Sequence, residues 1–173
     1  TFRQITDGFI KEDLGMLHKA ESTMRRKREE LKNSRRKEMI GFRKIDPEVA
    51  MEKNTWFHLG RNSCEEILYC LRRIADPCEE HVDNNFVPLS KEQVKEYIPL
   101  RDTVLFLLRR TEKILQTDSY DEVDEVRREA EELKDCLEKA REAQMQRMQS
   151  SKENIAVAYL YLNLLQETRE LTS

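Results

Sequence analysis

The sequence predicts an all-α fold, an antiparallel bundle of about five long helices. Charged and hydrophobic residues each make up 38% of the 173 residues, whereas only four glycines and four prolines occur. A β-sandwich or barrel needs more turn residues than this, and long amphipathic helices need few. Apolar residues also recur at steps of three and four over long stretches, as one face of a helix requires. The length is sufficient for one domain with a core of its own.

Composition also limits the classes of function that this chain is expected to have. A formal net charge of −3 predicts neither nucleic-acid nor membrane binding by bulk electrostatics. No signal peptide is evident, and no apolar run approaches the roughly 18 residues of a membrane span. Because the chain begins with Thr1 and not with methionine, we expect a fragment of a longer protein. Any membrane anchor would then lie outside these residues.

The four cysteines have no metal-site spacing. Cys64, Cys70 and Cys78 fall on or near the apolar side of one predicted helix, whereas Cys136 belongs to a later one. We therefore expect the first three to be small, reduced core residues. Reduced cysteines are typical of a cytosolic protein.

Residues 2–38 predict a first long helix, in which Ile10, Leu17, Met24 and Leu31 recur every seven residues. Its second half is strongly basic, with two acids, Glu29 and Glu30, among eight cations. These cations are Arg25, Arg26, Lys27, Arg28, Lys32, Arg35, Arg36 and Lys37.

This basic run has two interpretations. It is either a solvated face near a helix C-terminus or a contact for anionic lipid headgroups or an acidic partner. Without interleaved aromatic residues, stacking on nucleic-acid bases is not expected. The candidate contact residues are Arg25, Arg26, Arg28, Lys32, Arg35 and Arg36.

Residues 39–45 predict a loop, and Asp46-Pro47-Glu48 then predicts the start of a second helix. Aspartate suits the N-cap, proline the first helical position and glutamate the positive helix end. This helix contains the stretch from Asn54 to Asp83, around which the chain is organised. Its apolar stripe comprises Trp56, Leu59, Ser63, Ile67, Cys70, Leu71, Ile74, Cys78 and Val82. Pro77 predicts a kink or a local break after Asp76.

Three capping boxes predict three further helices, because each places a serine three residues before Gln or Glu. They are Ser90–Gln93, Ser119–Glu122 and Ser150–Glu153. Pro99 predicts a bend in the third helix, and the last helix is expected to reach Ser173. The connections between these long helices are short, which favours antiparallel neighbours in a bundle.

The helices overlay in pairs, the first on the fourth and the second on the fifth. This indicates two copies of one helical unit. Residues 1–85 would form the first copy, without its opening helix, and residues 86–173 the second, within one compact domain.

Few residues indicate catalysis or metal binding. The three histidines have no ligand spacing, and neither a nucleophile motif nor a phosphate-binding loop is evident. Carboxylates four apart on one helix face can share a hard cation or an iron-type cluster. Asp76 has Arg72 four residues before it, and Glu167 has Leu171 four residues after it. A pair between Asp76 and Arg72 or Arg73 is the simplest structural interpretation.

One element suggests a family. The segment Leu71-Arg-Arg-Ile-Ala-Asp76, followed by Val82, resembles an element on the last helix of each repeat in the PhoU family of phosphate-uptake regulators. The acidic run of residues 121–126 and the tandem helical layout are similar to that family as well. Within it, the chain looks most like the C-terminal cytosolic domain of bacterial Na/Pi cotransporter-related proteins.

The resemblance implies a six-helix bundle of two three-helix repeats. Members of the family carry metal clusters on E-x-x-x-D motifs, one in each repeat. By this resemblance Asp76 and Glu167 are candidate metal ligands, but Arg72 and Leu171 stand where the second carboxylates belong. We therefore expect no cofactor, or at most weak divalent or iron-type metal binding.

The expected function is that of a non-enzymatic regulatory domain of a bacterial sodium-dependent phosphate transporter. Its partners would be the membrane transport domain of the same polypeptide and anionic lipid headgroups, at the cytoplasmic side of the inner membrane. A homodimer is left open, and nucleic acid is not expected. The alternatives are a spectrin-like or coiled-coil interaction module, a stand-alone PhoU-type regulator, and a carboxylate metalloenzyme bundle.

Overall fold

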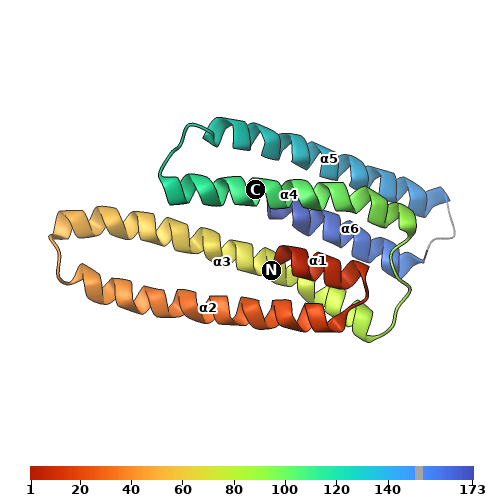
Figure 1. Cartoon of the computed structure of the whole chain (residues 1–173), viewed down its shortest axis with the longest axis horizontal. Helices are drawn as coiled ribbons and strands as arrows, with labels where there is room; N and C mark the ends of the chain where they lie inside the picture. Colours follow the sequence, from red (N-terminus) through yellow and green to blue (C-terminus); the bar gives the residue numbers. More distant parts are fainter. Residues whose placement is uncertain (151–153) are drawn as a thin grey trace.

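The computed structural model describes residues 1–150 and 154–173. Within these ranges the chain forms six helices and no strand, which confirms the all-α prediction. The helices are α1 (Phe2–Ile10), α2 (Leu14–Phe42), α3 (Pro47–Asp83), α4 (Lys91–Thr117), α5 (Val123–Ser150) and α6 (Ile155–Glu170). Neighbouring long helices run antiparallel, as Figure 1 shows.

The single helix expected over residues 2–38 is wrong, because the chain turns between α1 and α2. Glu12 adopts a left-handed backbone conformation, with φ of 54°. Asp13 then caps α2, and its side chain accepts a hydrogen bond of 3.1 Å from the backbone N–H of Met16. An aspartate before an apolar periodic stretch is an ordinary N-cap signal.

The loop expected over residues 39–45 is shorter than predicted. α2 continues to Phe42, whose ring packs edge-on against that of Phe57, with 5.7 Å between the ring centroids. The predicted start of α3 is confirmed, since Asp46 accepts a hydrogen bond from the backbone N–H of Glu48 and Pro47 opens the helix. α3 is continuous through Pro77, so the local break is wrong, whereas the alternative, a kink, stays a prediction.

Of the three predicted capping boxes, the one at Ser90 and Gln93 is confirmed, with both reciprocal hydrogen bonds present. The second is wrong. The Ser119 hydroxyl hydrogen-bonds Asp121, and the carboxylate of Glu122 binds Arg110 instead. The third extends into residues 151–153, outside the described residues.

The last helix, α6, ends earlier than predicted. Asn154 caps α6 by accepting hydrogen bonds from the backbone N–H groups of Ala156 and Val157. α6 then ends at Glu170 and does not reach Ser173.

The core lies where α1 and α6 pack between two long helix pairs, α2–α3 and α4–α5 (Figure 1). α1 contacts α2, α3 and α4, whereas α6 contacts α3, α4 and α5. In the described part of the chain the backbones of α2 and α3 do not closely approach those of α4 and α5, because α1 and α6 lie between the two pairs. Fully buried side chains include Ile5, Leu17, Ile74, Val104, Leu137, Leu164 and Leu165.

Residues 1–85 contain α1 to α3, and residues 86–173 contain α4 to α6. The predicted absence of an opening helix from the first half rested on one unbroken helix over residues 2–38. With that helix divided, α1 precedes the α2–α3 pair. That the halves are copies of one unit stays a prediction. Among the described residues no helix combines the length and the hydropathy needed to cross a bilayer.

The outer part of the α2–α3 pair, residues 31–67, extends beyond the ends of α1 and α6 (Figure 1). We call it the arm. None of its residues is buried, so the apolar stripe of α3 is covered only along its inner half. Ile74 and Cys78 are each 1% exposed, whereas Trp56 is 69% exposed. The expectation that Cys64 belongs to the core is also wrong, because Cys64 is exposed in the arm.

Candidate docking site

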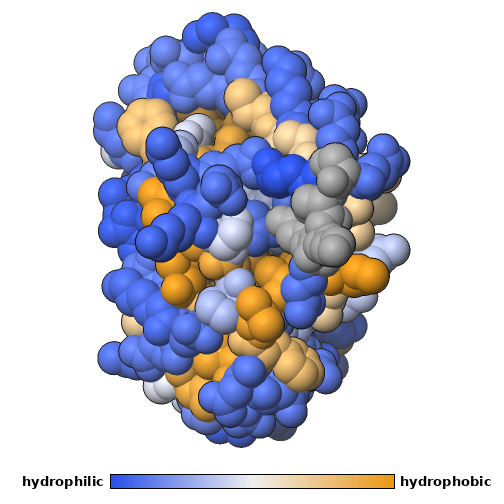
Figure 2. Space-filling model, turned by 90° about the vertical axis from the view of Figure 1, so that its right-hand side faces the viewer, coloured by the Kyte–Doolittle hydropathy of each residue, from blue (hydrophilic) through white to orange (hydrophobic). Residues whose placement is uncertain are grey.

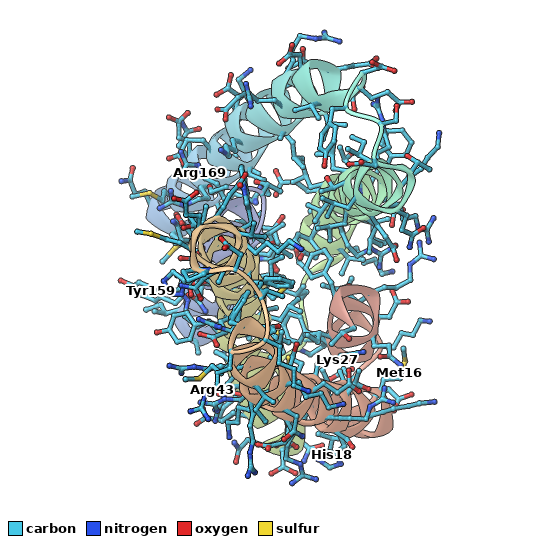
Figure 3. All side chains as sticks on the ribbon, turned by 90° about the vertical axis from the view of Figure 1, so that its left-hand side faces the viewer. Met16, His18, Lys27, Arg43, Tyr159 and Arg169 are labelled. Carbon is cyan, nitrogen blue, oxygen red and sulfur yellow. The ribbon has the colours of Figure 1, made fainter. Side chains whose placement is uncertain are left out.

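All six candidate contact residues of the basic run are exposed on α2. The opposite face of that helix buries Leu17, Ala20 and Met24, and the periodicity of the helix leaves the cations in solvent. Figure 3 looks at the molecule from the end that carries the α2–α3 turn, where the side chains of this pair point outward into solvent.

The cations of the basic run divide into paired and unpaired ones. Lys27 binds Glu30 at 2.7 Å and Lys32 binds Glu29 at 2.8 Å, and these hydrogen bonds lower the pKa of both carboxyl groups. Arg25, Arg26, Arg28, Arg35 and Arg36 form no ion pair within the part of the chain that the structure describes. Their charge is therefore available to an anionic partner.

A groove of about 800 Å³ runs between α2 and α3 beside this run. Arg28, Lys32 and Arg35 line its α2 wall. A smaller adjoining pocket of about 230 Å³ brings Arg25 and Arg28 of α2 next to Arg72 and Asp76 of α3. The structure thus joins two regions that the sequence separates by some fifty residues, which helix periodicity alone does not reveal.

Asp76, the first candidate metal ligand, is held by an arginine. Arg72 Nε donates a hydrogen bond of 3.0 Å to Asp76 Oδ2, and both side chains are more than half exposed. An exposed pair of this kind contributes less than about 1 kcal/mol. Asp76 is thus engaged as the simplest structural interpretation expects.

Glu167, the second candidate, lies on α6 and is 6% exposed. Arg73 of α3 donates a hydrogen bond of 2.6 Å from Nε to Glu167 Oε2, and its Nη2 forms an ion pair with the same oxygen. The hydrogen bond from Arg73 to Glu167 is the largest cause that raises the pKa of the Arg73 guanidinium. The Arg73 guanidinium also lies over the Tyr69 ring, 5.0 Å from its centroid. Glu167 therefore links α6 to α3.

The two candidate ligands are thus bound to two different arginines of α3, one at the surface and one inside. Among the described residues, no group of three His, Cys, Asp or Glu side chains is placed to hold a metal ion. What the structure brings together at Arg72, Arg73, Asp76 and Glu167 is a set of charge pairs.

The sequence did not reveal a second surface, an apolar groove of about 560 Å³ in the arm. It lies between α2 and α3 and is lined by Leu31, Ser34, Glu38, Lys53, Trp56, Phe57, Gly60, Arg61 and Cys64. The periodic stripe of α3 was the available signal, but periodicity does not tell which part of a stripe is covered.

A polar network in the core was also not predicted. Gln93 and Gln144 are hydrogen-bonded to each other at 3.2 Å and are at most 1% exposed. The Tyr97 hydroxyl lies 2.9 Å from Thr168 Oγ1, and the pKa of Tyr97 is raised mainly by burial. These bonds join α4 to α5 and α6, and they satisfy polar groups that would otherwise be costly to bury.

At the end of the bundle opposite the arm, Phe86, Val87 and Ile155 are exposed. Figure 2 shows hydrophobic surface on this end.

Comparisons of the chain with models of protein families, with curated proteins and with solved structures found no match. The resemblance to the PhoU family therefore stays a prediction.

Proposed function

We propose that this chain is a non-enzymatic, PhoU-like regulatory domain of a bacterial sodium-dependent phosphate transporter. It acts at the cytoplasmic side of the inner membrane and modulates phosphate uptake by docking to the membrane transport domain. The basic run of α2 is the docking surface, through Arg25, Arg26, Arg28, Lys32, Arg35 and Arg36.

The observation that carries this proposal is the place of the segment on which the resemblance rests. Leu71, Ile74 and Ala75 are buried on α3, a helix that packs on α6. The next residue that the resemblance singles out, Glu167, faces this segment from α6 and binds Arg73. The segment of α3 and the residue of α6 that were chosen for their similarity to one family are thus joined by the contact of Arg73 with Glu167.

The electrostatics support docking as the mechanism. Five arginines of the run have no ion pair within the described residues, and three of them, Arg25, Arg28 and Arg35, line concave surface next to α3. Such cations steer an acidic partner and set its orientation, with a strong dependence on salt. Asp76 and Glu167 are engaged by Arg72 and Arg73, which favours structural roles for these carboxylates over metal binding.

The packing also bears on the alternative of a spectrin-like module. Such a module continues its helices end to end from one unit to the next, whereas here α1 and α6 pack between two antiparallel pairs (Figure 1). This arrangement supports the compact regulatory bundle. Reading the coding sequence upstream of Thr1 is the simplest discriminating observation, because the proposal requires several long apolar spans there. A short leader without such spans contradicts the transporter assignment.

Reversing the charge of the run tests the docking surface. In the complete protein, Arg25→Glu, Arg28→Glu and Arg36→Glu together are expected to change the rate of phosphate uptake and to weaken binding to the transport domain. The wild-type association should weaken with added salt, and the variant should have lost most of that dependence.

A matched control reverses three exposed cations of α4, by Lys91→Glu, Lys95→Glu and Arg109→Glu. These side chains form no ion pair among the described residues, so the control should behave as wild type. Flotation with vesicles of anionic or neutral phospholipid separates headgroup binding from docking to protein. Equal uptake and equal association in the α2 variant and the wild type would overturn the proposed surface.

A further inference from the structure

The arm concentrates the exposed hydrophobic surface of this chain. Of the eighteen large hydrophobic side chains that are exposed in the described residues, nine lie in the arm. They are Met39, Ile40, Ile45, Val49, Met51, Trp56, Phe57, Leu59 and Ile67. The arm is about a fifth of the chain, so this is a concentration well above an even spread. Exposed apolar surface of such extent marks an interaction site.

The apolar groove of the arm continues a surface that is already an interface. The same stripe of α3 is buried by α6 and α1 along the inner half of the bundle, at Ile74 and Cys78. Past the ends of those two helices it carries on to Ile67 and Trp56, where no other helix of the described chain packs on the pair. Figure 3 shows that the α4–α5 pair stands apart from the arm at this end.

Charge on the arm is divided between its two helices. The α2 side, residues 31–44, carries six basic residues and one acid, Glu38. The α3 side, residues 46–67, carries five acids and two cations, Lys53 and Arg61. Within the described residues, the ion pair that joins the two helices of the arm is Arg61 with Glu38, at 3.9 Å. Among the described residues, the basic side chains of α2 therefore form no ion pairs with the acids of α3 across the arm.

We infer that the apolar groove of the arm binds the arm of a second copy of this chain, forming a four-helix bundle around a two-fold axis. In this arrangement the α2 of each copy lies next to the α3 of the other. The basic helix of one copy then has an acidic helix on both sides, and the apolar stripes face the shared centre. A partner of one charge sign would be repelled by one of the two helices, whereas a second copy matches both. Closed two-fold pairs are the commonest homo-oligomers.

The shape of the groove also suits this contact. A Cβ added at Gly60, which lines the groove, would meet no atom within 4 Å, so the surface is open at this position. Trp56 stands beside Gly60 in the same groove and is largely exposed. A large side chain next to open space gives each copy both a projection and a hollow, as helix packing between side chains requires.

Sedimentation equilibrium of the whole chain tests the contact, and the wild type is expected to show the mass of a dimer. Trp56→Gln with Leu59→Gln removes apolar surface without adding charge, and both side chains are exposed, so the fold should persist. This variant should raise the dissociation constant at least about tenfold. The control variant, Leu115→Gln with Tyr159→Gln, removes two equally exposed side chains outside the arm and should dimerise as wild type does.

Charge reversal tests which helices meet. Arg43→Glu with Lys44→Glu makes the tip of the α2 side acidic, and Glu48→Lys with Glu52→Lys makes the start of α3 basic. Each variant alone should be mostly monomeric, because its arms repel each other. A mixture of the two should form heterodimers, since the reversed α2 of one then meets the reversed α3 of the other. Circular dichroism of each variant checks that its helices are intact.

A wild type that stays monomeric at all accessible concentrations overturns the inference, and so does a dimer that survives Trp56→Gln with Leu59→Gln. A mixture that stays monomeric overturns the proposed pairing of α2 with α3. None of these substitutions falls in the basic run, so they test the dimer without reversing the charge of the docking surface, although Lys32, Arg35 and Arg36 of that surface belong to the arm.

Discussion

Two carboxylates with the same expected role prove to have very different surroundings. Asp76 is exposed and pairs with Arg72 on its own helix, whereas Glu167 is nearly buried and pairs with Arg73 on another. A buried charge that loses its partner keeps its desolvation cost, while an exposed charge is simply hydrated. The two positions should therefore respond differently to substitution.

We expect Glu167→Ala to lower the free energy of unfolding by about 2 kcal/mol, the scale of a lost hydrogen bond to a charged group. Asp76→Ala should lower it by less than about 1 kcal/mol, as for an exposed ion pair. Urea unfolding followed by circular dichroism gives both values. Equal effects at the two positions would show that the contact of Glu167 with Arg73 does not stabilise the packing of α6 on α3.

Metal analysis of the purified protein bears on the same residues. Because each carboxylate is engaged by an arginine, Asp76→Ala and Glu167→Ala should leave the metal content of the protein unchanged. A loss of bound iron or of a divalent ion in either variant would restore the metal-site interpretation of that residue.

At the scale of single helices, the sequence predicts where a helix begins better than where a helix is interrupted. Asp46 and Ser90 open α3 and α4 as expected, because a capping side chain satisfies backbone N–H groups that are otherwise unpaired. The turn before α2 was missed because seven-residue spacing of apolar residues continues across it. The pattern persists since α1 folds back on α2, and both helices face the same core. Ser119 does not form the predicted capping box with Glu122. The carboxylate of Glu122 binds Arg110 and Lys113 instead.

Gly8 explains part of that turn. A Cβ at Gly8 would lie 3.0 Å from Leu17 Cγ and 3.2 Å from the backbone oxygen of Asp13. The close approach of α1 to α2 therefore requires glycine here. At Gly41, near the end of α2, a Cβ would meet no atom within 4 Å.

We expect Gly8→Ala to destabilise the protein by about 1 kcal/mol, because overpacking outweighs the gain in helix propensity. Gly41→Ala should instead stabilise it, by up to about 1 kcal/mol, since only the propensity gain remains. Thermal unfolding of the two variants compares them directly. A stabilised Gly8→Ala variant would mean that α1 can move away from α2 at no cost.

For the whole molecule, the fold class followed from composition and periodicity, whereas the extent of the core did not. The stripe from Trp56 to Val82 has one period throughout, yet only its inner half is covered. The cover of α3 comes from α1, which folds back at the turn before Asp13, and from α6, which ends at Glu170. The pairing of Arg73 with Glu167 likewise depends on packing between helices far apart in the sequence.

The uneven core predicts uneven stability along the α2–α3 pair. Residues near Leu17 and Ile74 are packed by α1 and α6, whereas the arm is held mainly by contacts between its own two helices, such as Phe42 with Phe57. Local opening costs least where few apolar contacts are broken. In amide hydrogen exchange we therefore expect residues 31–67 to exchange faster than the inner parts of the same helices in dilute protein.

The concentration dependence of that exchange connects the arm to the proposed dimer. Pairing of two arms buries the exposed stripe, so protection of residues 31–67 should rise with protein concentration, while protection around Ile74 stays constant. In the variant Trp56→Gln with Leu59→Gln, the arm should exchange rapidly at every concentration. Equal protection along the whole of α3 in dilute protein would contradict the uneven core. If the arm exchanges fast and its exchange does not change with protein concentration, the arm does not pair with a second copy of the chain.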